Sequence, residues 1–266
     1  MRQEDNMDTI LELKNVTKRF SGLVAVDNLS ICQERGTIHS LVGPNGSGKS
    51  TSISMINGML PLTEGEIFFN GDKISGLPVH EIAQRGVGRT FQNIKVFGTM
   101  SVLENVMVGG HALNKKSGGI IKYLVNIGGT NREEKLIREK AMEALEFVGI
   151  QDLKDMQVKN LAYGRQKMTE LARALVNKPQ LLLLDEPAAG LNPSERAELT
   201  DMLIKIHESG VSLFLVEHNM DIVMNISDII TVINFGAKIA EGTPDVVKND
   251  NEVIRAYLGS KYKKAE

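Results

Sequence analysis

The run at residues 43–51 carries the residue types best suited to chemistry. It reads G-P-N-G-S-G-K-S-T and fits the Walker A pattern G-x-x-x-x-G-K-[ST], with an apolar run before it and a short helical run after it. Glycines allow backbone conformations in which several N–H groups point at one anion, and the following helix adds its positive end. We therefore expect phosphate contacts from Gly43, Pro44, Asn45, Gly46, Ser47, Gly48, Lys49, Ser50 and Thr51.

Three side chains of this run have separate expected tasks. Lys49 places a cation on the β and γ phosphates, Ser50 offers its hydroxyl to Mg²⁺, and Thr51 supports the α phosphate. The alternative is a glycine-rich turn that binds nothing. The strand expected before the run and the helix expected after it favour the phosphate site.

A second candidate set follows four leucines at 181–184. Asp185 and Glu186 end this apolar run. A buried strand that ends in acid places a carboxylate at the sheet edge where a Walker A loop also opens. We expect Asp185 to hold Mg²⁺, directly or through water, and Glu186 to accept a proton from an attacking water. Apolar strands ending in acid are common, so this assignment depends on the Walker A run.

Gln92 and His218 each follow a predicted strand and are candidates for the γ-phosphate end of the site. Gln92 would bind Mg²⁺ or water, and His218 would donate to the γ phosphate or orient the water. Taken singly, both are better explained as polar residues at strand ends, and their order beside the other motifs favours the site. Phe20, on a loop before the Walker A strand, either stacks on adenine or anchors the core.

Strands and helices alternate along the chain, which predicts an α/β core with a largely parallel sheet. Residues 10–16 are expected to form a strand, and residues 18–30 a second strand broken by Ser21 and Gly22. Capping boxes at 101–104 and 130–133 predict two helix starts, and the Asn cap, Pro and Glu at 192–195 predict a third. We expect one domain over 1–266, with a core lobe at about 8–93 and 166–260 and a helical lobe at about 94–165. A glycine-interrupted insertion at 109–130 includes a short helix at 120–125.

The composition is that of an ordinary globular protein, with 266 residues, 42% apolar and 24% charged, and a net charge of −2. Near-neutral charge argues against binding nucleic acid over a broad surface. The single cysteine, Cys32, fits a reducing compartment. We expect no signal peptide and no bilayer-spanning run, so another chain would have to supply spanning helices for work at a membrane.

The order of these motifs resembles that of the ATP-binding-cassette (ABC) ATPases over nearly the whole chain. The resemblance implies a P-loop NTPase fold with a RecA-like core, an antiparallel β subdomain and an inserted α-helical subdomain. It implies a transport-coupled ATPase that uses ATP and Mg²⁺. By position, it assigns the adenine-stacking aromatic to Phe20, the Q-loop glutamine to Gln92, the Walker B aspartate to Asp185, the catalytic base to Glu186 and the switch histidine to His218.

Two departures from the family pattern indicate a branch. The signature, usually L-S-G-G-Q, is L-A-Y-G-R at 161–165, so Ala162 removes a hydroxyl contact to the γ phosphate and Tyr163 replaces a glycine. Gly164, the backbone N–H groups and the helix end remain. The D-loop at 189–192 ends in Asn192 where Asp is usual. Both departures look like the branch serving branched-chain amino-acid importers, as do V-E-H-N-M-D-I-V-M and the tail I-A-E-G-T-P-D-V-V-K-N-D-N-E-V-I-R-A-Y-L-G.

The resemblance also implies partners. In this family the signature of one subunit completes the ATP site of another, so Ala162, Tyr163 and Gly164 would contact nucleotide on a second cassette, a copy or a paralogue. Membrane-spanning permease subunits, and indirectly a solute-binding protein, are implied, with this chain peripheral on the cytoplasmic face of the inner membrane. Phe97 and Met100 would form the permease groove or pack within the helical lobe.

Other functions fit the same motifs. Within transport, the alternatives are urea or amide import and lipid export. A soluble ATPase acting on DNA or ribosomes is disfavoured, because the stretch between Gln92 and Leu161 is short and lacks sustained heptads, and because there is one cassette. A structural nucleotide-binding module without hydrolysis is a third option.

Overall fold

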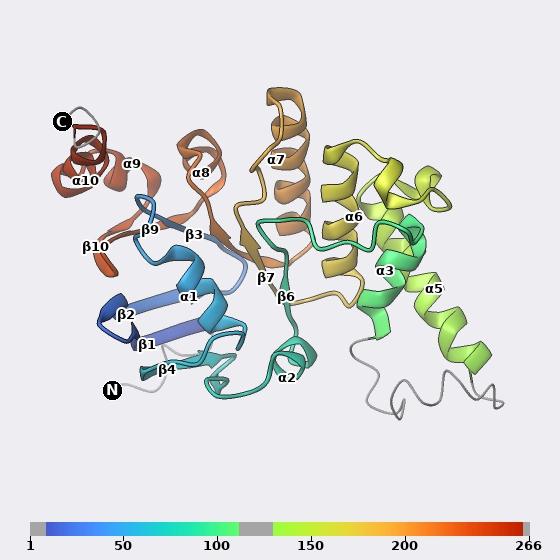
Figure 1. Cartoon of the computed structure of the whole chain (residues 1–266), viewed down its shortest axis with the longest axis horizontal. Helices are drawn as coiled ribbons and strands as arrows, with labels where there is room; N and C mark the ends of the chain where they lie inside the picture. Colours follow the sequence, from blue (N-terminus) through green and yellow to red (C-terminus); the bar gives the residue numbers. More distant parts are fainter. Residues whose placement is uncertain (1–8, 112–129, 263–266) are drawn as a thin grey trace.

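The computed structural model describes residues 9–111 and 130–262, which form two sheets and the helices around them (Figure 1). The smaller sheet is antiparallel, with the order β2-β1-β4-β5. Its strands are β1 (Thr9–Phe20), β2 (Leu23–Glu34), β4 (Glu64–Phe69) and β5 (Asp72–Lys73). The expected antiparallel subdomain is therefore confirmed.

The β1–β2 hairpin corrects one expectation. Phe20 pairs with Leu23, so Ser21 and Gly22 are the two-residue turn between two long strands and do not interrupt one strand. Ser21 has a φ of 49°, the left-handed conformation that such tight hairpin turns require. Phe20 is consequently the last residue of β1 and does not lie on a loop.

The larger sheet has the order β10-β9-β3-β8-β7-β6 and is parallel except between β10 and β9. Its strands are β3 (Ile38–Val42), β6 (Val87–Arg89), β7 (Leu181–Asp185), β8 (Ser212–Val216), β9 (Ile229–Asn234) and β10 (Ala237–Gly242). The largely parallel α/β core is confirmed. The C-terminal ends of β3, β6, β7 and β8 meet at one edge, and the candidate site lies there.

The helices cover both faces of the larger sheet. They are α1 (Lys49–Ile56), α2 (Val79–Gln84), α3 (Val102–His111), α5 (Thr130–Phe147), α6 (Tyr163–Leu175), α7 (Pro193–Glu208), α8 (Met220–Ile226), α9 (Pro244–Lys248) and α10 (Asn251–Tyr262), with 3₁₀ turns η1 (Gln151–Leu153) and η2 (Val158–Asn160). None of these described helices is long and apolar enough to cross a membrane.

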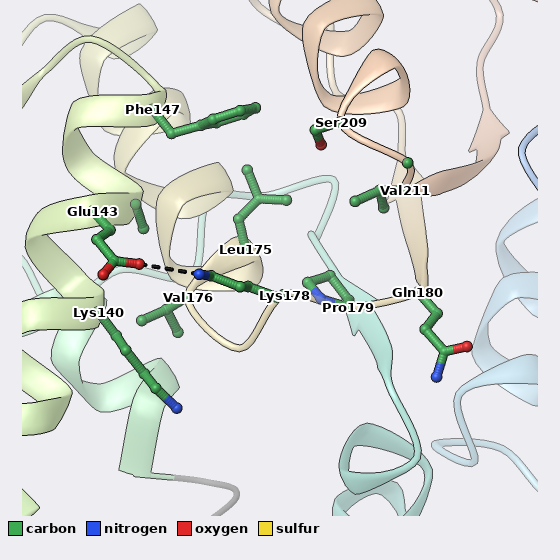
Figure 2. A pocket seen from close by; sticks show the side chains of 12 residues that line it. Lys140, Glu143, Phe147, Leu175, Val176, Lys178, Pro179, Gln180, Ser209 and Val211 are labelled. Carbon is green, nitrogen blue, oxygen red and sulfur yellow. Dashed lines mark ion pairs between the residues drawn. The ribbon is translucent and has the colours of Figure 1, made fainter.

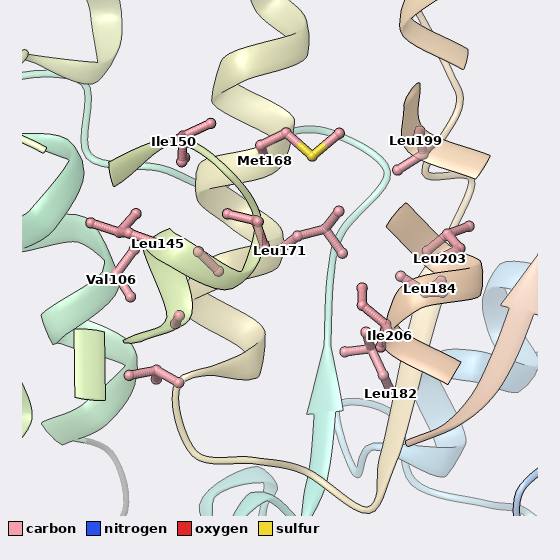
Figure 3. Packing of buried hydrophobic residues seen from close by; sticks show 14 of the residues in the cluster. Val106, Leu145, Ile150, Met168, Leu171, Leu182, Leu184, Leu199, Leu203 and Ile206 are labelled. Atoms are coloured by element: carbon pink, nitrogen blue, oxygen red, sulfur yellow. The ribbon is translucent and has the colours of Figure 1, made fainter. Parts of the chain in front are cut away.

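The leucines of β7 join two cores, because successive strand residues point to opposite faces. Leu181 and Leu183 pack with α1 and the antiparallel sheet. Leu182 and Leu184 pack with α3, α5, α6 and α7 in the cluster shown in Figure 3. The central sheet thus shares one apolar core with α3, α5 and α6, and α6 lies between the sheet and the other two helices (Figure 1).

Helix α3 begins at the capping box predicted at 101–104. The Glu104 carboxylate accepts the Ser101 N–H at 2.7 Å, and the Ser101 hydroxyl accepts the Glu104 N–H at 3.2 Å, which is a capping box. Helix α5 begins at Thr130. The helix predicted at 120–125 lies outside the described residues.

Candidate nucleotide-binding and hydrolysis site

The Walker A loop lies between β3 and α1, where two close backbone approaches require glycine. A Cβ on Gly43 would lie 2.1 Å from the Ile233 carbonyl oxygen, and one on Gly48 would lie 2.4 Å from the Ala25 carbonyl oxygen. Gly48 also has a φ of 105°, a conformation that side chains oppose. Gly48 is the N-cap of α1 and offers no side-chain cap, so the first N–H groups of α1 point toward the loop.

Lys49 is buried at the start of α1, and its ammonium is held inside the loop. Its Nζ donates to the carbonyl oxygens of Gly43 at 2.8 Å and Pro44 at 3.0 Å. Burial lowers the pKa of Lys49, while the charges of Glu186 and Asp185 act in the opposite direction. The two carboxylates therefore lie near enough to interact electrostatically with the Lys49 ammonium, as the Walker A and Walker B assignments require.

Asp185 is the last residue of β7 and is 5% exposed. Its Oδ2 pairs with a guanidinium nitrogen of Arg89 at 3.1 Å. Its Oδ1 is buried and has no hydrogen-bond partner among the described residues. Burial raises the pKa of Asp185, and the Arg89 charge opposes that rise. A buried oxygen without a partner is the chemistry that a bound cation satisfies.

Glu186, Gln92 and His218 converge at the end of the sheet. Gln92 Nε2 donates to Glu186 Oε2 at 2.8 Å, and His218 Nδ1 lies 3.5 Å from the same oxygen. Gln92 follows β6, Glu186 follows β7 and His218 follows β8, so three neighbouring parallel strands bring the three side chains together. The structure thus assembles the residues that the sequence places at the γ-phosphate end.

These residues line one cleft of about 770 Å³ beside the Walker A loop. Phe20, which is 43% exposed, also lines this cleft, so it is no core anchor. The Lys18 ammonium lies 5.0 Å from the Phe20 ring centre. The cleft is lined by Phe20, Leu23, Val24, Ala25, Asn45, Gly46, Gly48, Lys49, Ser50, Thr51, Gln92, Glu186, His218 and Phe235.

The signature residues do not line this cleft. Tyr163 is the first residue of α6, and its ring lies close to Gly190 of the D-loop. A Cβ on Gly164 would meet the carboxylate of Glu195 at 2.8 Å. Ala162 is the N-cap of α6 and provides no side-chain cap. Ala162, Tyr163 and Gly164 therefore form a separate surface with the D-loop.

Sequence reasoning missed three residues of the site. Arg89 pairs with Asp185, and its signal was a charged residue inside the strand predicted before Gln92. Phe235, 84% exposed at the β9–β10 turn, lines the cleft. Glu217 is fully buried: its Oε1 accepts the Ala188 N–H at 2.9 Å, and its Oε2 accepts the His218 N–H at 3.0 Å. Glu217 thereby connects the segment after β7 to His218.

A second cleft, of about 490 Å³, lies between α5 and the segments that flank β7 and β8 (Figure 2). An ion pair of 3.1 Å joins Lys178 and Glu143 there, with side chains 80% and 61% exposed. None of the predicted site residues lines it. Because the pair is open to solvent, it contributes little stability.

Comparisons with known proteins agree with this geometry. A family profile described as ABC transporter matches residues 26–189, and one described as branched-chain amino acid ATP-binding cassette transporter matches residues 237–263. The chain is 41% identical to the high-affinity branched-chain amino acid transport ATP-binding protein BraF of Pseudomonas aeruginosa, over 94% of this chain and 98% of that protein. It is 39% identical to LivG of Escherichia coli K12, again over 94% and 98%.

Solved structures show the same architecture. A crystal structure of an ATP-binding cassette of an ABC transporter, in its ADP conformation, superimposes with a TM-score of 0.82 at 32% identity, covering 94% of this chain and 99% of that one. Fold and cleft together define a P-loop ATPase. The chain belongs to the ATP-binding proteins of ABC transporters, in the LivG and BraF branch, whose ATP hydrolysis is coupled to transport.

Proposed function

We propose that this chain hydrolyses ATP in the 770 Å³ cleft to energise the import of branched-chain amino acids. The observation that carries the catalytic assignment is the convergence of Gln92 and His218 on Glu186 beside Lys49. The names of the BraF and LivG relatives, and the C-terminal family match, support the solute. Urea or amide import and lipid export have no comparable support.

Each site residue has a proposed task. Phe20 stacks on the adenine, and residues 43–51 hold the phosphates through backbone N–H groups and the Lys49 cation. Glu186 accepts the proton of the attacking water, while Gln92 and His218 fix its carboxylate and orient the water. These groups are fixed before reaction, so they stabilise developing charge without reorganisation.

The residues also fit Mg²⁺. Ser50, Gln92 and Asp185 offer the oxygen ligands that Mg²⁺ prefers, and Asp185 has a buried oxygen free of other partners among the described residues. Bound there, the ion would neutralise charge on the β and γ phosphates. Arg89 then has the separate task of holding the second oxygen of Asp185.

A second cassette, a copy or a paralogue, completes the site in this proposal. Ala162, Tyr163 and Gly164 lie outside the cleft of their own chain, and the first turn of α6 is uncapped by any side chain. The N–H groups of such a turn favour an anion. The signature of one subunit is proposed to close on the γ phosphate held by the other.

Permease subunits are proposed to dock at the boundary between the helical lobe, residues 94–165, and the core lobe. A groove of about 360 Å³ there is lined by Phe97, Phe91 and Arg173 among others. Phe97 is 50% exposed, whereas Met100 is half-buried and does not line the groove. Docking there would place the chain on the cytoplasmic face of the inner membrane, with a solute-binding protein acting indirectly.

Two substitutions test the site. Lys49→Ala is expected to weaken ATP binding, because it removes the buried cation of the phosphate loop. Glu186→Gln is expected to retain binding and reduce kcat by roughly 10²- to 10⁴-fold, the range for loss of a general base. Binding is measured with a fluorescent ATP analogue and turnover by phosphate release. Unchanged hydrolysis in Lys49→Ala would refute the phosphate site.

A further inference from the structure

One side of α6 carries three charged residues at a spacing of three, Lys167, Glu170 and Arg173. Lys167 is 3% exposed and Glu170 is 1% exposed, so both charges lie in the protein interior. Lys167 Nζ and Arg173 each lie 3.8 Å from a Glu170 carboxylate oxygen. Burial lowers the pKa of Lys167 and raises that of Glu170, and each charge opposes the shift of the other. Burying a charge costs free energy of folding unless polar partners compensate for it, so the partners of these three side chains are informative.

All three side chains hold the segment that follows β6. Lys167 Nζ donates to the carbonyl oxygens of Phe91 at 3.4 Å and Gln92 at 3.3 Å. Glu170 Oε1 accepts the Lys95 N–H at 3.2 Å, and the Arg173 guanidinium donates to the Lys95 carbonyl oxygen. Residues 92–95 belong to no helix or strand, so the side chains of α6 replace the regular hydrogen bonds that would otherwise position this backbone.

The same segment carries the residue that fixes the catalytic carboxylate. Lys167 holds the main chain of Gln92, and the Gln92 side chain donates to Glu186 at 2.8 Å. A continuous series of contacts therefore leads from the first turns of α6 to Glu186. Lys167 does not line the cleft, so we expect no direct contact between its side chain and bound nucleotide.

We propose that Lys167 is a positioning residue for hydrolysis: it sets the backbone of Gln92, and through Gln92 the orientation of Glu186. Glu170 and Arg173 complete this attachment at Lys95. The proposal rests on the roles proposed above for Gln92 and Glu186. It assigns to α6 a function within its own chain, in addition to carrying the signature residues at its start.

The test separates positioning from stability. Lys167→Met fills a similar volume without a donor, and we expect a kcat reduction on the order of tenfold, as small misplacements of catalytic groups produce. The dissociation constant for ATP should stay within about twofold, since the phosphate loop is untouched. Lys167→Met alone also leaves the Glu170 charge without its nearest ammonium, which should lower stability.

The double variant Lys167→Met with Glu170→Gln removes both buried charges and should restore much of the stability. Because it still lacks the donor to Gln92, kcat should stay low. The matched control is Lys178→Met with Glu143→Gln, an exposed pair remote from the cleft, which should change neither quantity. Recovery of kcat together with stability in the double variant would overturn the proposal, as would a normal kcat in Lys167→Met.

Failure of this inference is distinguishable from failure of the site assignment. If Gln92→Ala and Glu186→Gln both reduce kcat while Lys167→Met does not, the site stands and the role of Lys167 is wrong. If Gln92→Ala and Glu186→Gln leave kcat unchanged, the site assignment itself is wrong.

Discussion

At the scale of single residues, Glu186 adopts a backbone conformation that its surroundings impose. Its φ is 45°, in the left-handed region that disfavours a side chain such as glutamate. The Glu186 N–H donates to the Val216 carbonyl oxygen of β8 at 2.8 Å, which holds the turn in place. The chain therefore leaves β7 abruptly, and the carboxylate meets Gln92 and His218. Local strain of this kind is found at functional sites.

His39 gives a prediction at the same scale. It is 1% exposed in β3, its Nε2 lies 2.8 Å from the Thr231 hydroxyl, and its ring stacks on Phe214. Burial lowers its pKa to about 4. The folded state thus binds fewer protons than the unfolded state between pH 6.5 and 4, so stability is lost as pH falls through this window.

By this linkage, the free energy of unfolding should fall by about 2–3 kcal/mol from pH 7 to 4.5 because of His39. Urea unfolding at both pH values measures the loss. The variant His39→Gln keeps a polar group for Thr231 but does not titrate, and its loss should be smaller by that amount. Equal losses in both proteins would mean that His39 is not the buried neutral group described.

The positions of candidate site residues were predictable where they belong to a local pattern. Lys49, Asp185 and Glu186 follow from short motifs read with their expected strands and helix. Arg89 and Lys167 were not predictable, because their partners Asp185 and Gln92 lie 96 and 75 positions away. Such pairs come together only in the folded chain, and neither Arg89 nor Lys167 belongs to a sequence motif that indicates its partner.

At the scale of elements, short-range signals were reliable and strand limits were not. The N-terminal caps of α3 and α7 form as predicted. In α7 the Asn192 N–H donates to the Glu195 carboxylate and the Glu195 N–H donates to the Asn192 side-chain oxygen, at 3.0 Å each. By contrast, β1 was expected to end at Val16 and continues to Phe20. Its last residues are polar or exposed, and they are held by hairpin pairing with β2, as Arg19 with Val24 and Phe20 with Leu23. Irregularities in the register of this hairpin disturb the alternation of apolar residues, so the sequence pattern does not reveal where the strand ends.

The capping box of α3 gives the prediction for an element. Ser101→Ala removes the acceptor for the Glu104 N–H and should lower the free energy of unfolding by about 1 kcal/mol. Thr99→Ala, an exposed neighbour, is the control and should lie within about 0.5 kcal/mol of the wild type. Urea unfolding compares them. If Ser101→Ala is as stable as Thr99→Ala, the cap does not stabilise α3.

Across the molecule, the two sets of residues proposed to act on ATP lie on different surfaces. The cleft contains the Walker A loop, Glu186 and His218. The signature surface contains Ala162, Tyr163 and Gly164, with Tyr163 40% exposed against the D-loop. None of the three signature residues lines the cleft of its own chain. A second subunit is the economical way to unite them, since two copies related by a twofold axis would form two equal sites.

This arrangement predicts an ATP-dependent dimer. The purified Glu186→Gln variant should retain unhydrolysed ATP, because it lacks the proposed base. In the presence of Mg²⁺ and ATP, its mass measured by light scattering should be twice the mass measured without nucleotide. The mass doubles because nucleotide links the cleft of one copy to the signature residues of the other. The double variant Lys49→Ala with Glu186→Gln loses the buried phosphate cation and should keep the single-chain mass under the same conditions. A single-chain mass for Glu186→Gln at saturating ATP would contradict a site shared between two copies. Assembly with a paralogous cassette would then be the arrangement to examine, by the same measurement on the mixed subunits.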